Sequence, residues 1–365
     1  MQPTKSLFAG IVCLLIMGLP ASAQSVSIGY LPIATQPEAV SESLGLFKKY
    51  GIDAHLQLFR NGPAALQALM SGDIQMVDGG AVPMLNMAAQ GMPVYFLSSS
   101  GINTPEFPGG NIMIRKDETA IKSFSELKGR RIGQLAKGTN TYFWLWNATN
   151  KFGMDRTSFQ EIFVPFPQMG ALLASNQVDA VYTWHPYDTL IEQEGQGKKL
   201  TDDSTWNPYS QAGALVVKRD WADKNPDTVR KLVKISIETN RWIDDHPDEG
   251  REVIGKNMGL AETVYRTMAR FYFPRNGYQL IPSIWDTYYL MVKSGEFQPL
   301  TDPQGTINDY WIKPAERFVG PAVQELGVQD DPVVTRALRI KLENLPEPPE
   351  KYIPSFERSV SGGNP

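Results

Sequence analysis

The chain has 365 residues, a length that predicts two structural units of ordinary size. Its composition, 42% hydrophobic, 20% charged and 10% aromatic, is typical of a soluble globular protein and excludes intrinsic disorder and collagen-like structure. The formal net charge of -4 comes without a basic stripe, which argues against a nucleic-acid partner.

The first 23 residues have the pattern of a secretory signal peptide. Lys5 supplies a positive charge, residues 7–19 are an apolar run, and residues 21–23 read Ala-Ser-Ala, which is typical of a cleavage site. The apolar run is shorter than the ~20 residues that a membrane-spanning helix needs. We expect cleavage after Ala23, with a permanent anchor as the alternative.

The only cysteine, Cys13, lies inside this apolar run, so the mature chain has no thiol. Val12 stands before it, where a lipoprotein signal has a small residue, and lipid anchoring is therefore the weaker alternative. An exported protein without a disulfide or a lipid fits the bacterial periplasm. We expect a periplasmic protein that is secreted through its N-terminal signal peptide.

Beyond the signal segment, strands and helices alternate. The pattern predicts strands at 26–30, 52–59 and 75–78, with helices at 37–50 and 63–70 between them. A similar module follows, with strands at 132–135, 159–164 and 178–184 and helices at 139–151 and 168–174. This alternation predicts mostly parallel sheets covered by helices, with ligands bound at the carboxyl ends of the strands.

The two modules predict two lobes joined by two crossings of the chain. Residues 111–117 and 214–220 are both apolar strands that end in two basic residues and an Asp, and we interpret them as hinge strands. Chance likeness of two ordinary strands is the alternative. On this interpretation residues 24–112 and 214–365 form the first lobe, with the C-terminal helices and tail, and residues 113–213 form the second.

The region after Asp220 is predicted to be helical. Amphipathic patterns lie at 226–243, 249–258, 261–271 and 284–294. From Val328 onward the sequence is richer in proline and charge, which predicts a tail that packs loosely or frays.

Motifs for catalysis and metal binding are missing from the sequence. His55, His185 and His246 are scattered, so no zinc-binding H-E-x-x-H helix is present. Residues 133–138 have the glycine spacing of a nucleotide-binding loop, but Thr139 and Asn140 stand where such a loop needs Lys and then Ser or Thr. We expect no catalytic residue, no metal and no cofactor.

Several short segments carry a family resemblance through their order and spacing. They are IGY at 28–30, LFKKYGI at 46–52, ALQALMSGDI at 65–74, LKGRRIG at 127–133, ALLASNQVDA at 171–180 and WHPY at 184–187. Together they resemble the nitrate/sulfonate/taurine-type family of ABC transporter substrate-binding proteins over residues 26–260. The resemblance implies an α/β, two-lobed periplasmic-binding-protein (type II) fold with mixed, mostly parallel sheets and two crossover hinge strands, closing on a small anionic ligand.

The resemblance also places the ligand against four loops. In chain order these loops carry Tyr30, Thr35 and Gln36; Gly80 and Ala81; Gly138, Thr139, Asn140, Thr141 and Tyr142; and Trp184 and His185.

The helix start at 138–142 has the strongest physical support. Free backbone N–H groups, the positive end of the helix dipole and the hydroxyls of Thr139 and Thr141 suit a carboxylate or sulfonate without any Arg. In the alternative, Thr139 or Asn140 is only the N-cap of its own helix. Gly80, with Gly79 before it, permits close approach to a ligand or only a tight turn.

The remaining candidates have alternatives too. Thr35 and Gln36 are either ligand contacts or solvated loop residues. His185 stands where the family commonly has an acidic residue between Trp and Pro, which favours an anionic ligand, and a structural histidine is the alternative. Tyr30, Tyr142 and Trp184 are expected to face the cleft and favour an organic sulfonate or carboxylate with an apolar or aromatic body, although aromatic stripes are more often core.

We therefore expect a monomeric solute-binding component of an ABC importer, which docks at the inner membrane on permease and ATPase subunits. An enzyme on the same fold is one alternative, because thiamine-pyrimidine synthases resemble this family. Those enzymes have a cysteine-rich motif that the mature chain lacks. A ligand-sensing module for a membrane receptor is the other alternative.

Overall fold

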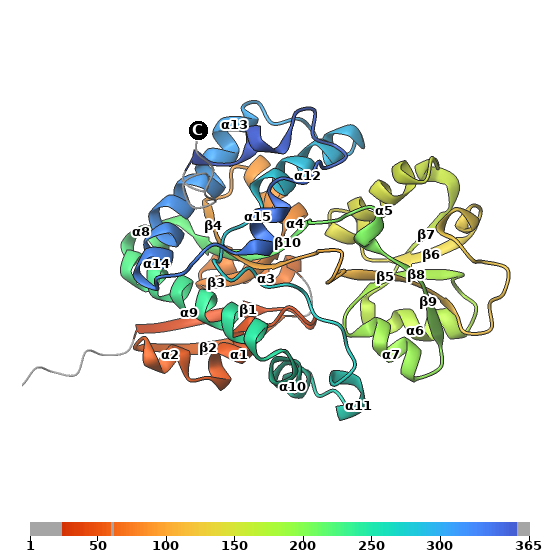
Figure 1. The fold of residues 1–365 in the computed structure, drawn as a ribbon, viewed down its shortest axis with the longest axis horizontal. Coiled ribbons are helices and arrows are strands. Elements are labelled where there is room, and N and C mark those ends of the chain that lie inside the picture. The colour runs from red at the N-terminus through yellow and green to blue at the C-terminus, as the bar shows by residue number, and fades with distance from the viewer. Residues whose placement is uncertain (1–23, 60–61, 356–365) are drawn as a thin grey trace, which may run out of the picture.

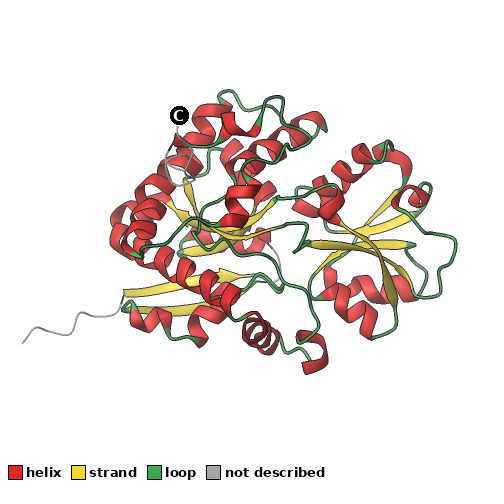
Figure 2. Cartoon of the chain, viewed as in Figure 1, coloured by secondary structure: helices red, strands yellow, loops and turns green. Residues whose placement is uncertain are grey.

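The computed structural model describes residues 24–59 and 62–355. They form two lobes, each built on a five-stranded sheet (Figure 1, Figure 2). The expected signal peptide, with Cys13, lies outside the described residues. Within the described ranges no helix is long and apolar enough to cross a membrane.

The first sheet belongs to the first lobe and mixes parallel and antiparallel pairs. Its spatial order is β2 (Ile52–Leu58), β1 (Gln24–Tyr30), β3 (Met76–Gly80), β10 (Gln211–Lys218) and β4 (Val94–Ile102). β1 pairs in parallel with β2 and β3, whereas β10 runs antiparallel to both β3 and β4. The carboxyl ends of β1 and β3 therefore lie at the same edge of the sheet.

The second sheet repeats this arrangement in the second lobe. Its order is β7 (Gln160–Phe163), β6 (Arg131–Gln134), β8 (Ala180–Trp184), β5 (Gly110–Arg115) and β9 (Gly197–Asp202). β6 pairs in parallel with β7 and β8, and β5 runs antiparallel to β8 and β9. In both lobes the fourth strand of the sheet, β10 or β5, is the first strand after the chain has crossed from the other lobe.

The two crossings, residues 103–109 and 203–210, join β4 to β5 and β9 to β10. The buried Asp203 carboxylate links them, because it accepts hydrogen bonds from the Asn103 side chain at 3.2 Å and from the Gly109 N–H at 3.1 Å. The Tyr182 hydroxyl donates a third hydrogen bond at 2.9 Å. The segments expected as hinge strands are β5 and β10, and each lies within one sheet, directly after a crossing.

Helices cover both faces of the first sheet. They are α1 (Pro37–Ser43), α2 (Leu46–Lys49), α3 (Gly62–Ser71), α4 (Ala81–Ala89), α8 (Arg219–Lys224), α9 (Pro226–Asp245) and α10 (Pro247–Asn257). One apolar cluster joins α3 and α4 to the sheet, and a second joins α2 and α9 to its other face. The single helix expected at 37–50 is wrong, because Gly45 adopts a left-handed φ of 67° and divides it into α1 and α2.

The second lobe has helices α5 (Asn140–Lys151), α6 (Phe166–Ala174) and α7 (Tyr187–Gln193). Its apolar core includes Trp144 of α5, Leu173 of α6 and Val181 of β8. These helices and strands match the elements predicted from the second module, with ends that differ by a few residues.

The C-terminal region lies mainly on the first lobe, where the blue part of the chain covers the upper face in Figure 1. It contains α11 (Glu262–Tyr265), α12 (Ile281–Lys293), α13 (Pro303–Ile307), two π-helical segments at 308–312 and 315–319, α14 (Gly320–Glu325) and α15 (Pro332–Ala337). α11 is shorter than the helix expected at 261–271, because the chain leaves the helix after Tyr265 and Tyr272 bridges to Ile102 of β4.

The expectation of a loose tail from Val328 is wrong for residues 328–355. Asp331 is fully buried and caps α15, accepting hydrogen bonds from the N–H groups of Val333 and Val334. It also accepts from the Tyr272 hydroxyl at 3.0 Å. Apolar residues such as Leu338 are buried beside it, so burial outweighs the polar composition.

Candidate functional site

The loops at the carboxyl ends of the strands of both lobes meet between the two sheets. After β1, the Ala34 N–H donates to the carbonyl of His185, which follows β8, at 3.1 Å. The Tyr187 hydroxyl donates to the Pro32 carbonyl at 2.8 Å. Asn140, at the start of α5, contacts the start of α4 after β3. The structure therefore brings the four loops that the resemblance selects together in two pairs, the first loop with the fourth and the second with the third.

Asn140 forms the most direct connection between the lobes. Its side-chain Oδ1 accepts a hydrogen bond from the Val82 N–H at 2.9 Å, and its Nδ2 donates to the Ala212 carbonyl at 2.7 Å. Val82 lies in the first turn of α4, where backbone N–H groups have no partner within their own helix. Asn140 thus caps the N-terminus of a helix in the other lobe.

Gly80 is the N-cap residue of α4, and Ala81, fully buried, is the first residue of the helix. A Cβ on Gly80 would lie 3.1 Å from Asn140 Oδ1, which is tighter than ordinary contact. Glycine at this position therefore allows the two helix starts to approach each other. The sequence suggested that Gly79 and Gly80 either allow a ligand to approach or form a tight turn. Neither alternative predicts the close contact between Gly80 and Asn140.

Thr139 is the N-cap of α5, as the alternative from the sequence proposed. Its hydroxyl accepts from the Tyr142 N–H at 3.4 Å and lies 3.1 Å from the buried Thr141 hydroxyl. Gly138 precedes it with a φ of 77°, close to Asn86 of α4. The N-terminal turns of α4 and α5 therefore lie against each other, and each carries the positive end of its own helix dipole.

Gln36 and Thr35 are buried in the loop after β1. The Gln36 Nε2 donates to the Leu31 carbonyl and its Oε1 accepts from Asn257, both at 2.9 Å. Gln36 therefore stabilises the loop itself. The Thr35 hydroxyl interacts with the carboxylate of Asp78.

Two carboxyl groups that the sequence reasoning missed lie beside these loops. Glu38, in the first turn of α1, is 3% exposed, and neither of its carboxylate oxygens has a hydrogen-bond partner in the described part of the chain. Burial, together with the charge of Asp78, raises the pKa of Glu38 to about 8. Burial also raises the pKa of Asp78, while hydrogen bonds from Ser100 and Thr35 oppose that shift.

The sequence contains no signal that identifies Glu38 and Asp78 as a pair. Glu38 follows Pro37 at a helix start, and acidic residues there are common because they interact with the helix dipole. Asp78 precedes the two glycines at the end of β3. Neither position shows from sequence alone that the two carboxyl groups influence each other.

His185 is almost fully buried, and both of its ring nitrogens have partners inside the protein. Nδ1 lies 2.8 Å from Asp188 Oδ2, and Nε2 lies 2.9 Å from the Pro108 carbonyl in the first crossing. Burial opposes the charge on this imidazole, but the Asp188 carboxylate and the Pro108 carbonyl outweigh it and raise the pKa of His185. Burial likewise opposes ionisation of Asp188, and His185 outweighs it and lowers the pKa of Asp188. These contacts favour the structural alternative for His185.

Of the three predicted aromatic residues, Trp184 is best placed at the junction of the lobes. Its ring stacks on Trp144, with centroids 5.5 Å apart, and meets the edge of Phe271 at 5.4 Å. Its indole Nε1 has no hydrogen-bond partner within the described ranges. Tyr30 is half-buried at the end of β1.

Tyr142 connects the second lobe to the C-terminal region. Its hydroxyl donates to Glu296, which follows α12, and Lys137 pairs with the same carboxylate at 3.4 Å. The Arg156 guanidinium lies 4.5 Å from the centre of the Tyr142 ring. The ring is therefore held between cations, and its role as a ligand-stacking surface stays a prediction.

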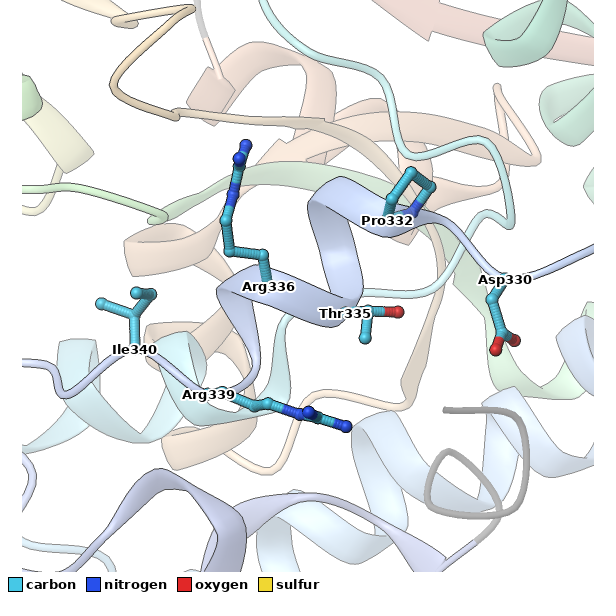
Figure 3. Close-up of a pocket in the computed structure, with 6 residues that line it drawn as sticks. All are labelled: Asp330, Pro332, Thr335, Arg336, Arg339 and Ile340. Atoms are coloured by element: carbon cyan, nitrogen blue, oxygen red, sulfur yellow. The ribbon is translucent and has the colours of Figure 1, made fainter. Parts of the chain in front are cut away.

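Two cavities in the described structure lie away from these loops. One, of about 630 Å³, lies along α15 and is lined by Asp330, Pro332, Thr335, Arg336, Arg339 and Ile340 (Figure 3). The other, of about 220 Å³, lies between α5, the second crossing and α12. Neither is lined by a predicted ligand-binding residue. In residues 24–59 and 62–355, no group of three or more His, Cys, Asp or Glu residues is arranged to hold a metal ion.

Residues 20–256 match the model of the NMT1-like family. The taurine-binding periplasmic protein of Escherichia coli is 26% identical over 242 residues, which cover 65% of this chain and 72% of that protein. The nitrate-binding protein NrtA from Synechocystis shares the fold with a TM-score of 0.70 at 16% identity, covering 84% of this chain and 90% of the other. The aliphatic sulphonate binding protein SsuA from Escherichia coli has a TM-score of 0.63 at 21% identity, covering 79% of this chain and 99% of the other.

An enzyme also shares this fold. The desulfurization enzyme DSZB has a TM-score of 0.61 at 16% identity, covering 83% of this chain and 99% of the other. The fold therefore carries both binding proteins and catalysis, and only the residues of the site can distinguish the two.

Proposed function

The chain belongs to the NMT1-like family, and we propose that it is the solute-binding component of an ABC importer, which captures a small organic anion between its lobes. The expected family resemblance and the two-lobed periplasmic-binding-protein fold are confirmed by the matching family model and by the solved structures. The captured solute, a sulfonate or carboxylate, passes to a permease driven by its ATPase. The named relatives, which are periplasmic proteins, support a periplasmic location.

One observation carries the proposal: the N-terminal turns of α4 and α5 face each other across the junction of the lobes. Asn140 Oδ1 now accepts the hydrogen bond of the Val82 N–H. A carboxylate or sulfonate oxygen is a stronger acceptor than an amide oxygen and also gains from the positive ends of the two helix dipoles. The backbone N–H groups of the two helix starts therefore favour an anion.

Closure of the lobes gives this binding its transport function. A ligand that contacts both helix starts stabilises the conformation in which the lobes touch, because it has more partners there than in an open form. The crossings at 103–109 and 203–210 are the only covalent connections between the two sheets in the described chain. A permease that recognises the closed form then receives loaded protein.

An enzyme on the same fold is the second candidate, because DSZB shares the architecture. The two candidates differ in what happens to the bound compound. A binding protein returns the compound unchanged, whereas an enzyme releases a product. Mass spectrometry of the compound recovered after prolonged incubation distinguishes them.

A thermal-shift screen tests the proposal. The mature protein, residues 24–365, is refolded to remove carried-over ligand and mixed with nitrate, bicarbonate, alkyl and aryl sulfonates, and aromatic carboxylates. A ligand at ~100 times its Kd adds about 2.7 kcal/mol to the free energy of unfolding, which raises the midpoint measurably. A shift with one class of organic anion supports the proposal, and no shift with any of these anions contradicts it.

A further inference from the structure

The cavity of about 220 Å³ lies where three parts of the chain meet. One wall is α5 of the second lobe, another is the second crossing, and the third is formed by α12 and residues 341–343 of the C-terminal region. Figure 1 shows α12 and α5 beside each other at the junction of the lobes. Because α12 packs on α4 of the first lobe, a rotation of the lobes changes the shape of this cavity.

Polar residues occupy the sides of both helices that meet at the cavity. On α12, Ser283, Asp286 and Thr287 line it, and their spacing of three and four residues places them on one side of the helix. On α5, Asn147 and Lys151 line it, four residues apart. A helix that packs on a core usually turns an apolar side inward. The polar lining therefore favours a binding role over packing alone.

The inner part of the cavity presents neutral hydrogen-bonding groups. Asn147, Asn207 and Thr287 are all buried there. The Thr287 hydroxyl has no hydrogen-bond partner within residues 24–59 and 62–355. A buried hydroxyl without a partner costs free energy that a bound hydrogen-bonding compound restores.

The charged side chains that line the cavity are two of each sign. Lys151 and Glu343 are exposed at its rim and pair with each other at 3.7 Å. Lys341 is exposed as well, and the half-buried Asp286 is the second carboxylate. Asp286 accepts hydrogen bonds from the N–H and the side chain of Asn344, at 2.7 and 3.3 Å. This balance of charge favours a neutral ligand over an ion.

We propose that the cavity binds a small neutral polyhydroxylated compound, a polyol or a monosaccharide, and that the bound compound holds the two lobes together. Hydroxyl groups both donate and accept, which matches a lining of amides, hydroxyls and a carboxylate. The rings of Trp144 and Trp206 provide apolar walls for the carbon skeleton. A volume of about 220 Å³ equals that of about seven water molecules, which limits the ligand to a single sugar unit.

The link to lobe closure follows from the contacts of Asn147. Its Nδ2 donates to the Trp206 carbonyl in the second crossing at 2.6 Å, and its Oδ1 accepts from Asn344 of the C-terminal region at 3.2 Å. One side chain of the second lobe thus joins the other two walls. A compound that contacts all three walls has its full set of partners only when they lie together, so its binding favours closure.

A ligand-observed NMR titration of the mature protein, residues 24–365, tests the binding directly. Xylitol and glucose are the probes. Sucrose, a disaccharide, is the control for size, and ethylammonium is the control for a cation. We expect xylitol or glucose to bind, and sucrose and ethylammonium to bind about 10-fold more weakly or not at all.

Two variants of Thr287 assign the binding to this cavity. Thr287→Val keeps the shape of the side chain but removes the hydroxyl, and should reduce the affinity for the bound polyol about 3–10-fold. Thr287→Met fills part of the cavity and should abolish the binding. Thr263→Val is the matched control, because Thr263 lies in α11, is exposed and does not line the cavity.

Asn140→Ala tests the link to closure. It removes the hydrogen bonds that join the start of α5 to the first lobe but changes no residue that lines the cavity. We expect the variant to bind the polyol about 5-fold more weakly than the wild type, or weaker still. Equal affinity in the two proteins overturns the link to closure.

The other outcomes decide the site itself. Weaker binding to both Thr287 variants, with unchanged affinity in Thr263→Val, supports it. Binding of ethylammonium without either polyol probe overturns the neutral class of ligand. No binding of any probe, or equal binding to every variant, overturns the site. Because the anion screen uses other compounds and other contacts, failure of this site leaves the proposed function intact.

Discussion

The side chain of Asn140 in the second lobe accepts a hydrogen bond at 2.9 Å from the backbone N–H of Val82 in the first lobe. The same amide donates to the carbonyl of Ala212, so one residue satisfies two backbone groups of the opposite lobe. In this way the start of α5 is attached to the start of α4. Under the proposed function, closure and ligand binding therefore involve the same atoms.

Removal of this side chain is expected to favour an open form. Asn140→Ala loses two buried hydrogen bonds, which weakens the closed form by about 1–3 kcal/mol. Small-angle X-ray scattering of the ligand-free protein should then give a larger radius of gyration than the wild type. Asn150→Ala is the control, because Asn150 lies in the same helix and its side-chain Nδ2 has no partner in the described chain. Identical scattering from both variants and the wild type contradicts the role of Asn140.

The buried pair of His185 and Asp188 is expected to stabilise the second lobe rather than to bind ligand. His185→Gln leaves Asp188 without its positive partner and costs about 3–5 kcal/mol of unfolding free energy, measured by urea denaturation. A double variant with Asp188→Asn regains part of that loss, because no uncompensated charge remains. Among folded variants, the affinity for the anion changes little. A large loss of affinity in the folded double variant contradicts this account.

The pH dependence of this pair follows from the two shifts. The pKa of His185 is raised in the folded protein. Its contribution to the free energy of unfolding is therefore complete below pH 6.5, the ordinary value, and disappears as the pH rises through the pKa of the folded state. The pKa of Asp188 is lowered in the folded protein. Its contribution to the free energy of unfolding is therefore complete above pH 3.8, the ordinary value, and disappears as the pH falls through the pKa of the folded state. The destabilisation by His185→Gln should therefore be larger at pH 5.5 than at pH 9. An equal loss at both pH values would show that the imidazole is not charged in the wild type.

Asp203 is expected to be the main polar connection between the two crossings. Its carboxylate accepts hydrogen bonds from Asn103, Gly109 and Tyr182, and Asp203→Ala leaves these donors unpaired in a buried position. We expect a loss of about 2–4 kcal/mol of unfolding free energy, and about 1 kcal/mol for Tyr182→Phe. Asp220→Ala, at an exposed position, should change stability by less than about 0.5 kcal/mol. Equal effects of the Asp203 and Asp220 variants contradict this prediction.

Glu38 is expected to make the ligand-free protein less stable at alkaline pH. Its pKa is raised from 4.5 to about 8, because the protein favours the protonated carboxyl group. The contribution of Glu38 to the free energy of unfolding is therefore complete below pH 4.5 and disappears as the pH rises toward 8. Between those values the wild type should lose up to about 1.4 kcal/mol per pH unit relative to Glu38→Gln. Urea denaturation of both proteins from pH 5 to pH 9 measures this difference. Parallel pH profiles of Glu38→Gln and the wild type contradict it, and Glu42→Gln should follow the wild type.

Local sequence patterns predict a large part of this fold. The alternation of apolar strands and amphipathic helices predicts both βα modules, because each element must bury one face against its neighbours. Thr139 as an N-cap is also a local property, since its partner is the N–H of Tyr142 three residues later. The division of the first helix at Gly45 was missed, because a glycine inside a helical pattern does not show whether it adopts a left-handed conformation.

The parts that escaped prediction depend on contacts between distant residues. Asn140 and Val82 are 58 positions apart, and only closure of the lobes brings them together. Glu38 is an ordinary acid at a helix start and Asp78 an ordinary acid at a strand end, and only the folded chain brings the charge of Asp78 close enough to raise the pKa of Glu38. The tail after Val328 has a polar composition but is fixed by Asp331, whose partners include Tyr272. Composition and periodicity contain no information about such partners.

A crystal structure of the protein with the anion that gives the largest thermal shift tests the central claim most directly. The account predicts electron density for the ligand between the N-terminal turns of α4 and α5, with its acidic oxygens accepting from backbone N–H groups that include that of Val82. Density for the ligand in the cavity along α15, beside Arg336 and Arg339, with the helix starts still joined by Asn140, would contradict the account.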